Sequence, residues 1–124
     1  SLELAGPRQA SQYTPSIAWR TSLNEALARA AQSDKPILID FTASWCPPCQ
    51  VMKREVWPSP EVVSLVEKGF VPVLLDIDLP ENQAVAQKYG VTSIPSIIVV
   101  DARGQVLRQA GFMTASEIRA FLDE

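Results

Sequence analysis

The sequence has no histidine and only two cysteines in 124 residues. Without histidine, neither a Ser-His-Asp triad nor a Cys-His pair can be built. Two cysteines are too few for the disulfide framework of a small secreted scaffold, and a structural zinc ion normally takes four Cys or His ligands. What remains is the chemistry that two thiols can perform together, and Cys46 and Cys49 are separated by only two residues.

Strong net charge and long apolar segments are also missing. The formal net charge is −3, and this balance argues against binding to nucleic acid or to anionic membranes, which both favour basic surfaces. No apolar run approaches the ~20 residues that a membrane-spanning helix needs. Residues 1–16 lack the basic start and apolar centre of a signal peptide. Because the chain begins with Ser1 rather than Met, we expect a mature product or an excised domain.

Helix and strand patterns alternate along most of the chain. The composition of residues 1–16 predicts a flexible arm or linker, and residues 17–124 are predicted to form one domain. Apolar residues at helical spacing after Ser22, Ser59 and Thr114 predict capped helices, and near-continuous apolar runs predict buried strands. We predict an α/β fold whose mixed central sheet has a parallel core and an antiparallel edge hairpin, flanked by helices. The expected strands are residues 17–19, 37–42, 70–77, 96–100 and 105–109.

Cys46 and Cys49 fall where an apolar strand gives way to a helix. Pro47 and Pro48 are tolerated in the first turn of a helix, so they place Cys46 at its N-terminus. Two intervening residues put both sulfurs on one face, close enough for a disulfide. The helix N-terminus favours a thiolate, which makes Cys46 the attacking thiol and Cys49 the resolving thiol. A half metal site and an inert structural disulfide are the alternatives.

The two prolines also bear on the direction of exchange. Neither Pro47 nor Pro48 has an N–H that could bond the Cys46 sulfur, so the Cys49 amide becomes the main local backbone donor. We therefore expect a mildly lowered pKa for Cys46. A strong oxidant needs a strongly stabilised thiolate and a reductant does not, so the pattern favours a reductant.

The strand and motif ILIDFTASWCPPC, residues 37–49, resemble the active site of the thioredoxin superfamily. The segment VTSIPS, residues 91–96, resembles its cis-proline loop. Lys35-Pro36 and residues 57–62 are similar to the C-terminal domain of DsbD-type thiol reductants. The resemblance runs from about Trp19 to the end and implies a thioredoxin fold. It also implies a periplasmic or otherwise extracytoplasmic setting, with the cytoplasm as the alternative.

The resemblance assigns roles to residues beside the cysteines. Asp40, an acid within an apolar strand, matches the family's buried aspartate and would accept the proton of Cys49. Burial should raise its pKa, and a hydrogen-bonded aspartate at a strand end is the alternative. The family often has a lysine nearby, where this chain reads Val73-Leu74-Leu75, so Asp40 should be harder still to ionise. Trp45 would shield the active site, or else be a plain core aromatic.

The loop at Ile94-Pro95 matches the family's cis-proline loop, with an ordinary trans proline as the alternative. Ile94 would pair with the substrate backbone as an added strand. We interpret Trp19 and Trp57 as packing residues. The expected substrate-binding residues are Trp45, Pro47, Pro48, Ile94 and Pro95.

These observations predict a thiol–disulfide oxidoreductase that reduces protein disulfides by dithiol exchange. It would need no cofactor and no metal, because the redox-active pair Cys46 and Cys49 carries the electrons. Its partners would be protein disulfide or dithiol substrates and an upstream thiol electron donor, for which a membrane-embedded protein is one candidate. We expect a monomer that binds no nucleic acid. The alternatives are a disulfide oxidase or isomerase of folding proteins, a non-catalytic binding module, and a metal-binding dimer that shares the two cysteines.

Overall fold

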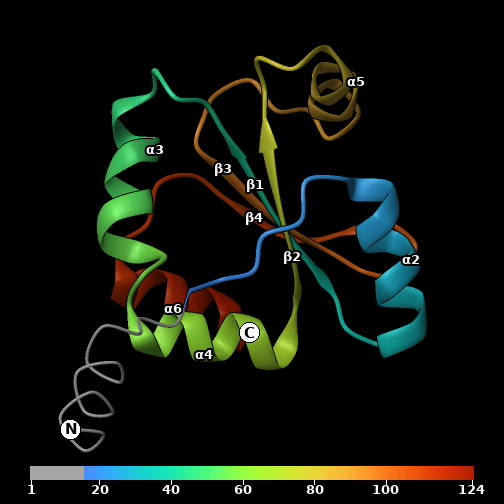
Figure 1. Cartoon of the computed structure of the whole chain (residues 1–124), viewed down its shortest axis with the longest axis horizontal. Helices are drawn as coiled ribbons and strands as arrows, with labels where there is room; N and C mark the ends of the chain where they lie inside the picture. Colours follow the sequence, from blue (N-terminus) through green and yellow to red (C-terminus); the bar gives the residue numbers. More distant parts are fainter. Residues whose placement is uncertain (1–15) are drawn as a thin grey trace, which may run out of the picture.

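The structure, a computed structural model, describes residues 16–124. The predicted arm, residues 1–16, lies outside the described residues apart from Ser16. Four strands form one sheet in the order β2-β1-β3-β4, with helices on both faces (Figure 1). The strands are β1 (Ile37–Thr42), β2 (Val71–Asp76), β3 (Ser96–Val100) and β4 (Val106–Ala110). The helices are α2 (Leu23–Ser33), α3 (Pro47–Val51), the π-helix η1 (Met52–Val56), α4 (Pro60–Gly69), α5 (Pro80–Lys88) and α6 (Ala115–Asp123).

The mixed α/β sheet is confirmed, but its parallel core is smaller than predicted. β1 pairs parallel with β2, whereas β1 with β3 and β3 with β4 are antiparallel. The cause is the place of α5, which lies beyond the end of the sheet where β2 finishes (Figure 1). The chain therefore re-enters the sheet from that same end, with Ser96 opposite Phe41. The sheet has one parallel pair and two antiparallel pairs.

No strand forms at residues 17–19, where one was predicted; a single bridge follows at the next residue. Arg20 pairs with Val73 in parallel, and its N–H donates to the Pro72 carbonyl oxygen at 3.0 Å. Just before it, the Trp19 N–H donates to the Ile17 carbonyl oxygen, two residues earlier. This tight turn bends the backbone away from the extended form, so the pairing cannot continue.

Side chains cap the helices at two of the three predicted positions; at the third, the Ser59 hydroxyl bonds the Glu61 carboxylate and makes no cap bond to the α4 backbone. Thr114 forms the full predicted capping box with Glu117. At Ser22, the hydroxyl accepts from the Glu25 N–H at 3.2 Å, but the Glu25 carboxylate pairs with Arg20 instead of returning to the cap. Half of the predicted box at Ser22 is therefore present, because a cation competes for the carboxylate.

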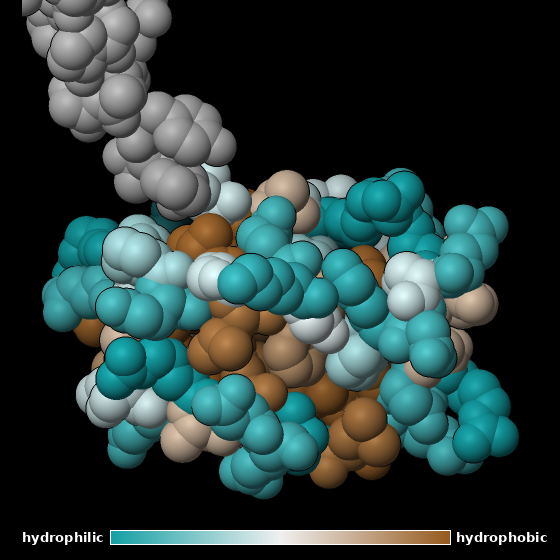
Figure 2. Space-filling view, turned by 90° about the horizontal axis from the view of Figure 1, so that it is seen from below, coloured by the Kyte–Doolittle hydropathy of each residue, from teal (hydrophilic) through white to brown (hydrophobic). Residues whose placement is uncertain are grey.

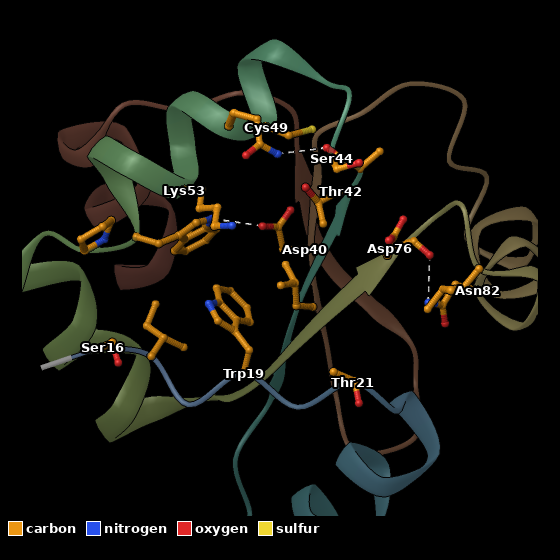
Figure 3. A pocket seen from close by; sticks show the side chains of 17 residues that line it. Ser16, Trp19, Thr21, Asp40, Thr42, Ser44, Cys49, Lys53, Asp76 and Asn82 are labelled. Atoms are coloured by element: carbon orange, nitrogen blue, oxygen red, sulfur yellow. Dashed lines mark hydrogen bonds between the residues drawn. The ribbon is translucent and has the colours of Figure 1, made fainter.

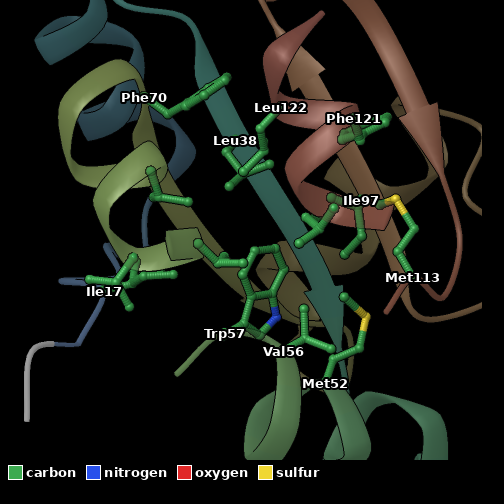
Figure 4. Close-up of a cluster of buried hydrophobic side chains, with 14 of the residues drawn as sticks. Ile17, Leu38, Met52, Val56, Trp57, Phe70, Ile97, Met113, Phe121 and Leu122 are labelled. Carbon is green, nitrogen blue, oxygen red and sulfur yellow. The ribbon is translucent and has the colours of Figure 1, made fainter. Parts of the chain in front are cut away.

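Alternation along β1 divides the core into two layers. Ile37, Ile39 and Phe41 belong to the layer beneath α2, while Leu38 belongs to the layer beneath η1, α4 and α6 (Figure 4). Successive side chains of a strand point to opposite faces. Asp40 therefore shares the face of Leu38, and a carboxyl group enters an otherwise apolar layer.

The surface is mixed in polarity. Seen from below, hydrophilic side chains cover much of this face, and hydrophobic ones are visible between them (Figure 2). Among the described residues, no helix has the length and apolar character that crossing a membrane requires.

Candidate active site

Cys46 and Cys49 form a disulfide where β1 leads into α3. Cys46 is the N-cap of α3, and Pro47 and Pro48 fill its first two positions. The Cα atoms of the two cysteines are 5.2 Å apart, and both side chains are buried. The two prolines are exposed beside them. The helix start predicted at this motif is confirmed.

The Cys46 sulfur has one backbone donor and one backbone acceptor near it. The Cys49 N–H donates to Cys46 Sγ at 3.3 Å, as the two prolines predict. The carbonyl oxygen of Ile94 lies 3.8 Å from the same sulfur, and the Ile94–Pro95 peptide bond is cis. Ile94 is partly buried and Pro95 is buried. The loop before β3 thus lies directly against the disulfide.

Trp45 is a surface residue and not part of the core. Its side chain is 62% exposed, and its indole N–H donates to both carboxylate oxygens of Asp78, at 2.9 and 3.1 Å. Trp45, Asp78 and Ile94 line a groove of about 650 Å³. Three of the expected substrate-binding residues, Trp45, Ile94 and Pro95, therefore meet in the loops around Cys46.

Asp40 lies at a second cavity, which also reaches Cys49. This cavity has a volume of about 430 Å³, and in Figure 3 the Asp40 side chain lies between Cys49 and Trp19. Burial raises the pKa of Asp40 from 3.8 to about 7, and a hydrogen bond from Trp57 opposes part of that rise. Asp40 would therefore be close to half-protonated at neutral pH.

Trp57 makes a contact that the sequence did not indicate. Its indole N–H donates to Asp40 Oδ2 at 3.0 Å, in addition to the packing role that we predict for it. Trp57 is buried within the apolar layer shown in Figure 4, and Trp19 packs edge-on against it with ring centroids 5.0 Å apart. No sequence pattern indicated the contact, because Trp57 and Asp40 lie on different elements, seventeen residues apart.

The described residues offer no metal site. No group of three or more His, Cys, Asp or Glu side chains is placed to hold a metal ion within residues 16–124. The site instead presents a redox-active disulfide, an adjoining loop and a buried acid. Together these groups can exchange electrons with thiols and move one proton.

Comparison with known proteins agrees with this geometry. A family model described as thioredoxin-like matches residues 18–102. A thioredoxin of Streptomyces clavuligerus is 38% identical over 81 residues, which cover 65% of this chain and 69% of that protein. Thioredoxin H5 of Arabidopsis thaliana is 36% identical over 88 residues, which cover 71% of this chain and 70% of that protein.

Solved structures extend the similarity to nearly the whole described chain. A DsbH oxidoreductase aligns with a TM-score of 0.78 and 27% identity, over 87% of this chain and 83% of its own. The oxidised C-terminal domain of DsbD from Neisseria meningitidis aligns with a TM-score of 0.72 and 27% identity, over 86% of this chain and 97% of that domain. A Cys-x-x-Cys disulfide between strand and helix on such a fold defines a thiol–disulfide oxidoreductase, as predicted. The chain belongs to the thioredoxin-like family.

Proposed function

We propose that this protein reduces the disulfide bonds of other proteins. In its reduced form, the Cys46 thiolate attacks one sulfur of a substrate disulfide, forms a mixed disulfide and releases the other sulfur as a thiolate. Cys49 then gives up its proton and attacks Cys46 Sγ, which releases the second substrate thiolate. The enzyme ends with the Cys46–Cys49 disulfide of this structure, and two electrons have passed to the substrate.

The observation that carries this direction is the hydrogen bonding of Cys46. Within the described residues, the Cys49 N–H is the one donor to its sulfur, because Pro47 and Pro48 have none. The nearby carbonyl oxygen of Ile94 would repel a negative charge there. A weakly stabilised thiolate favours giving electrons to a substrate over taking them.

The two hollows beside the disulfide support separate roles. The groove lined by Trp45 and Ile94 would hold the substrate, whose backbone would pair with Ile94 as an added strand. Pro47, Pro48 and Pro95 would complete that surface. Asp40, at the other cavity, would accept the proton of Cys49, because its pKa near 7 suits a base at neutral pH.

The reduction potential tests the direction. We expect equilibration with glutathione to give a value near the −270 mV of thioredoxin rather than the −120 mV of DsbA. A value near −120 mV would instead identify an oxidase of folding proteins. The purified protein should also reduce the disulfides of insulin when a chemical dithiol regenerates it.

Trapping tests the roles of the two thiols. Cys49→Ser should accumulate a mixed disulfide between Cys46 and a substrate protein, because the resolving step is blocked. Cys46→Ser is the matched control and should form none. Unchanged biological function in Cys46→Ser would support the non-catalytic binding module instead.

We further infer an extracytoplasmic setting with a membrane-embedded thiol protein as electron donor. The similarity to the C-terminal domain of DsbD supports this setting, and the similarity to thioredoxins supports the cytoplasmic alternative. Fractionation of cells that produce the natural full-length protein tests the inference. Recovery in the cytoplasm, with reduction by a soluble donor, would contradict it.

A further inference from the structure

The two carboxyl oxygens of Asp40 have different surroundings. Oδ2 accepts the indole N–H of Trp57 at 3.0 Å. Oδ1 is buried and has no hydrogen-bond partner among the described residues. Figure 3 shows the carboxyl group directed toward the side of the cavity where Thr42 and Cys49 lie. One oxygen is therefore held, and the other is free to exchange a proton.

The indole of Trp57 is itself fixed by its surroundings. Its side chain is 6% exposed, and Trp19 packs against it at an interplanar angle of 84°. The backbone N–H of Trp57 donates to the Met52 carbonyl oxygen, five residues earlier, at 2.9 Å. This wide π-turn changes the direction in which Trp57 leaves the helix compared with an α-helix. A close-packed interior then leaves the ring little freedom.

We propose that Trp57 is a positioning residue for disulfide exchange, because its indole holds Oδ2 of Asp40 so that Oδ1 can receive the proton of Cys49. The proton moves from the Cys49 thiol to Oδ1, directly or through a water molecule in the cavity. The sulfur that it leaves behind forms the bond to Cys46. This inference rests on the exchange mechanism proposed above and adds a residue to it.

The electrostatic consequence has a definite sign. A donor to a carboxylate stabilises the ionised form, so the indole lowers the pKa of Asp40 against the larger effect of burial. Besides Cys49, the titratable side chains that line the same cavity are Lys53 on η1 and Asp76 on β2. Lys53 is exposed and Asp76 partly exposed, so water screens both. Trp57 is therefore the neighbour whose loss should be felt most.

The first test replaces the donor and keeps the ring. Trp57→Phe should raise the pH midpoint of Asp40 in the reduced protein by about one unit, as expected for the loss of one hydrogen bond to a carboxylate. Carboxyl carbon NMR gives this midpoint, with Asp40→Asn to assign the signal. The pH at which resolution of a mixed disulfide becomes half-maximal should rise equally. Trp19→Phe is the matched control: it keeps an aromatic ring to pack against Trp57 and leaves the donor to Asp40 in place, so both midpoints should stay unchanged.

The second test needs no variant of Trp57 and so does not depend on its folding. In the wild type, the Trp57 indole N–H resonance should shift with pH at the Asp40 midpoint, and this shift should vanish in Asp40→Asn. The inference would be overturned if the Trp57 indole N–H resonance did not shift with pH, or if mixed-disulfide resolution in Trp57→Phe had the same pH dependence as in the wild type. Either result would leave the proposed reductase function intact. If the protein only oxidises its substrates, the proposed direction is wrong. The pH midpoints of Asp40 and of the exchange reaction, measured in the oxidising direction, would then still decide the role of Trp57.

Discussion

The indole N–H of Trp45 donates to both carboxylate oxygens of Asp78, at 2.9 and 3.1 Å. Trp45 directly precedes Cys46, and its ring is largely exposed. Without this bond, the ring could rotate freely at the edge of the groove. The bond therefore holds a large aromatic surface beside Cys46, at the groove proposed above to hold the substrate.

Removing this bond should weaken the use of protein substrates. We expect Asp78→Ala to lower kcat/KM for a protein disulfide about fivefold, since a hydrogen bond is worth about 1 kcal/mol. Asp78→Asn retains an acceptor oxygen and should lose less. A small aliphatic disulfide, which does not reach Trp45, should be reduced at the wild-type rate. Equal losses for the two substrates would place the effect on the cysteines instead.

Pro48 limits the stabilisation of the Cys46 thiolate. An N-cap side chain accepts from the second or third helical position, and Pro48 occupies the second. Pro48→Ala supplies the missing N–H, stabilises the reduced form, and should make the reduction potential less negative by about 30 mV, which corresponds to ~1.4 kcal/mol. Pro47→Ala, at the first position, is the control with a smaller shift. Equilibration of both variants with glutathione measures the change.

Asp40 should make the folded protein less stable as the pH rises. Its pKa is 3.8 in the unfolded chain and about 7 in the fold, so between these values the unfolded state releases a proton that the folded state keeps. The free energy of unfolding should fall across this window and level off above pH 7. The total change is on the order of 4 kcal/mol, at ~1.36 kcal/mol per pH unit.

Urea unfolding at pH 4, 6 and 8 measures this dependence against Asp40→Asn. The variant keeps an acceptor for Trp57 but cannot ionise, so it should match the wild type near pH 4 and exceed it at pH 8. Parallel curves for the two proteins would show that Asp40 ionises normally in the fold.

The turn between β3 and β4 depends on Gly104. Its φ is +85°, and an added Cβ would lie 3.2 Å from Tyr89 Oη, which donates to the Gly104 carbonyl oxygen at 2.9 Å. Gly104→Ala should therefore destabilise the fold by about 1–2 kcal/mol. Gly69→Ala is the control, since nothing lies within 4 Å of its Cβ position and alanine favours a helix. Thermal unfolding of both variants tests the difference.

Local patterns predicted most of the fold. Apolar runs located β1 and β3, and the Thr114 capping box is complete. The direction of β3 could not be predicted, because it depends on α5 remaining at one end of the sheet, which is a tertiary property. The missing strand at residues 17–19 has a different, local origin. Its apolar residues suited a strand, but a turn at Trp19 prevented extended pairing.

The candidate site was predictable where its residues are adjacent in sequence. The pairing of Cys46 with Cys49, and the Cys49 N–H as donor to Cys46 Sγ, follow from the spacing and the two prolines. The position of Ile94 was expected only from the resemblance. The partner of Asp40 could not be predicted: the resemblance points to β2 for a neighbour of Asp40, whereas the donor is Trp57, seventeen residues away. Spacing cannot reveal such a contact, because a π-turn alters the direction of the residue that follows it.

The hydrogen-bond partner of Asp40 is the neutral indole of Trp57 rather than a charged side chain. The influence of a charged amine is weakened by dissolved ions, whose screening length is ~10 Å at 0.1 M. Dissolved ions screen buried groups much less, and the Trp57 indole and Asp40 are both buried and in direct contact. The pKa of Asp40 should therefore change little between low and high ionic strength.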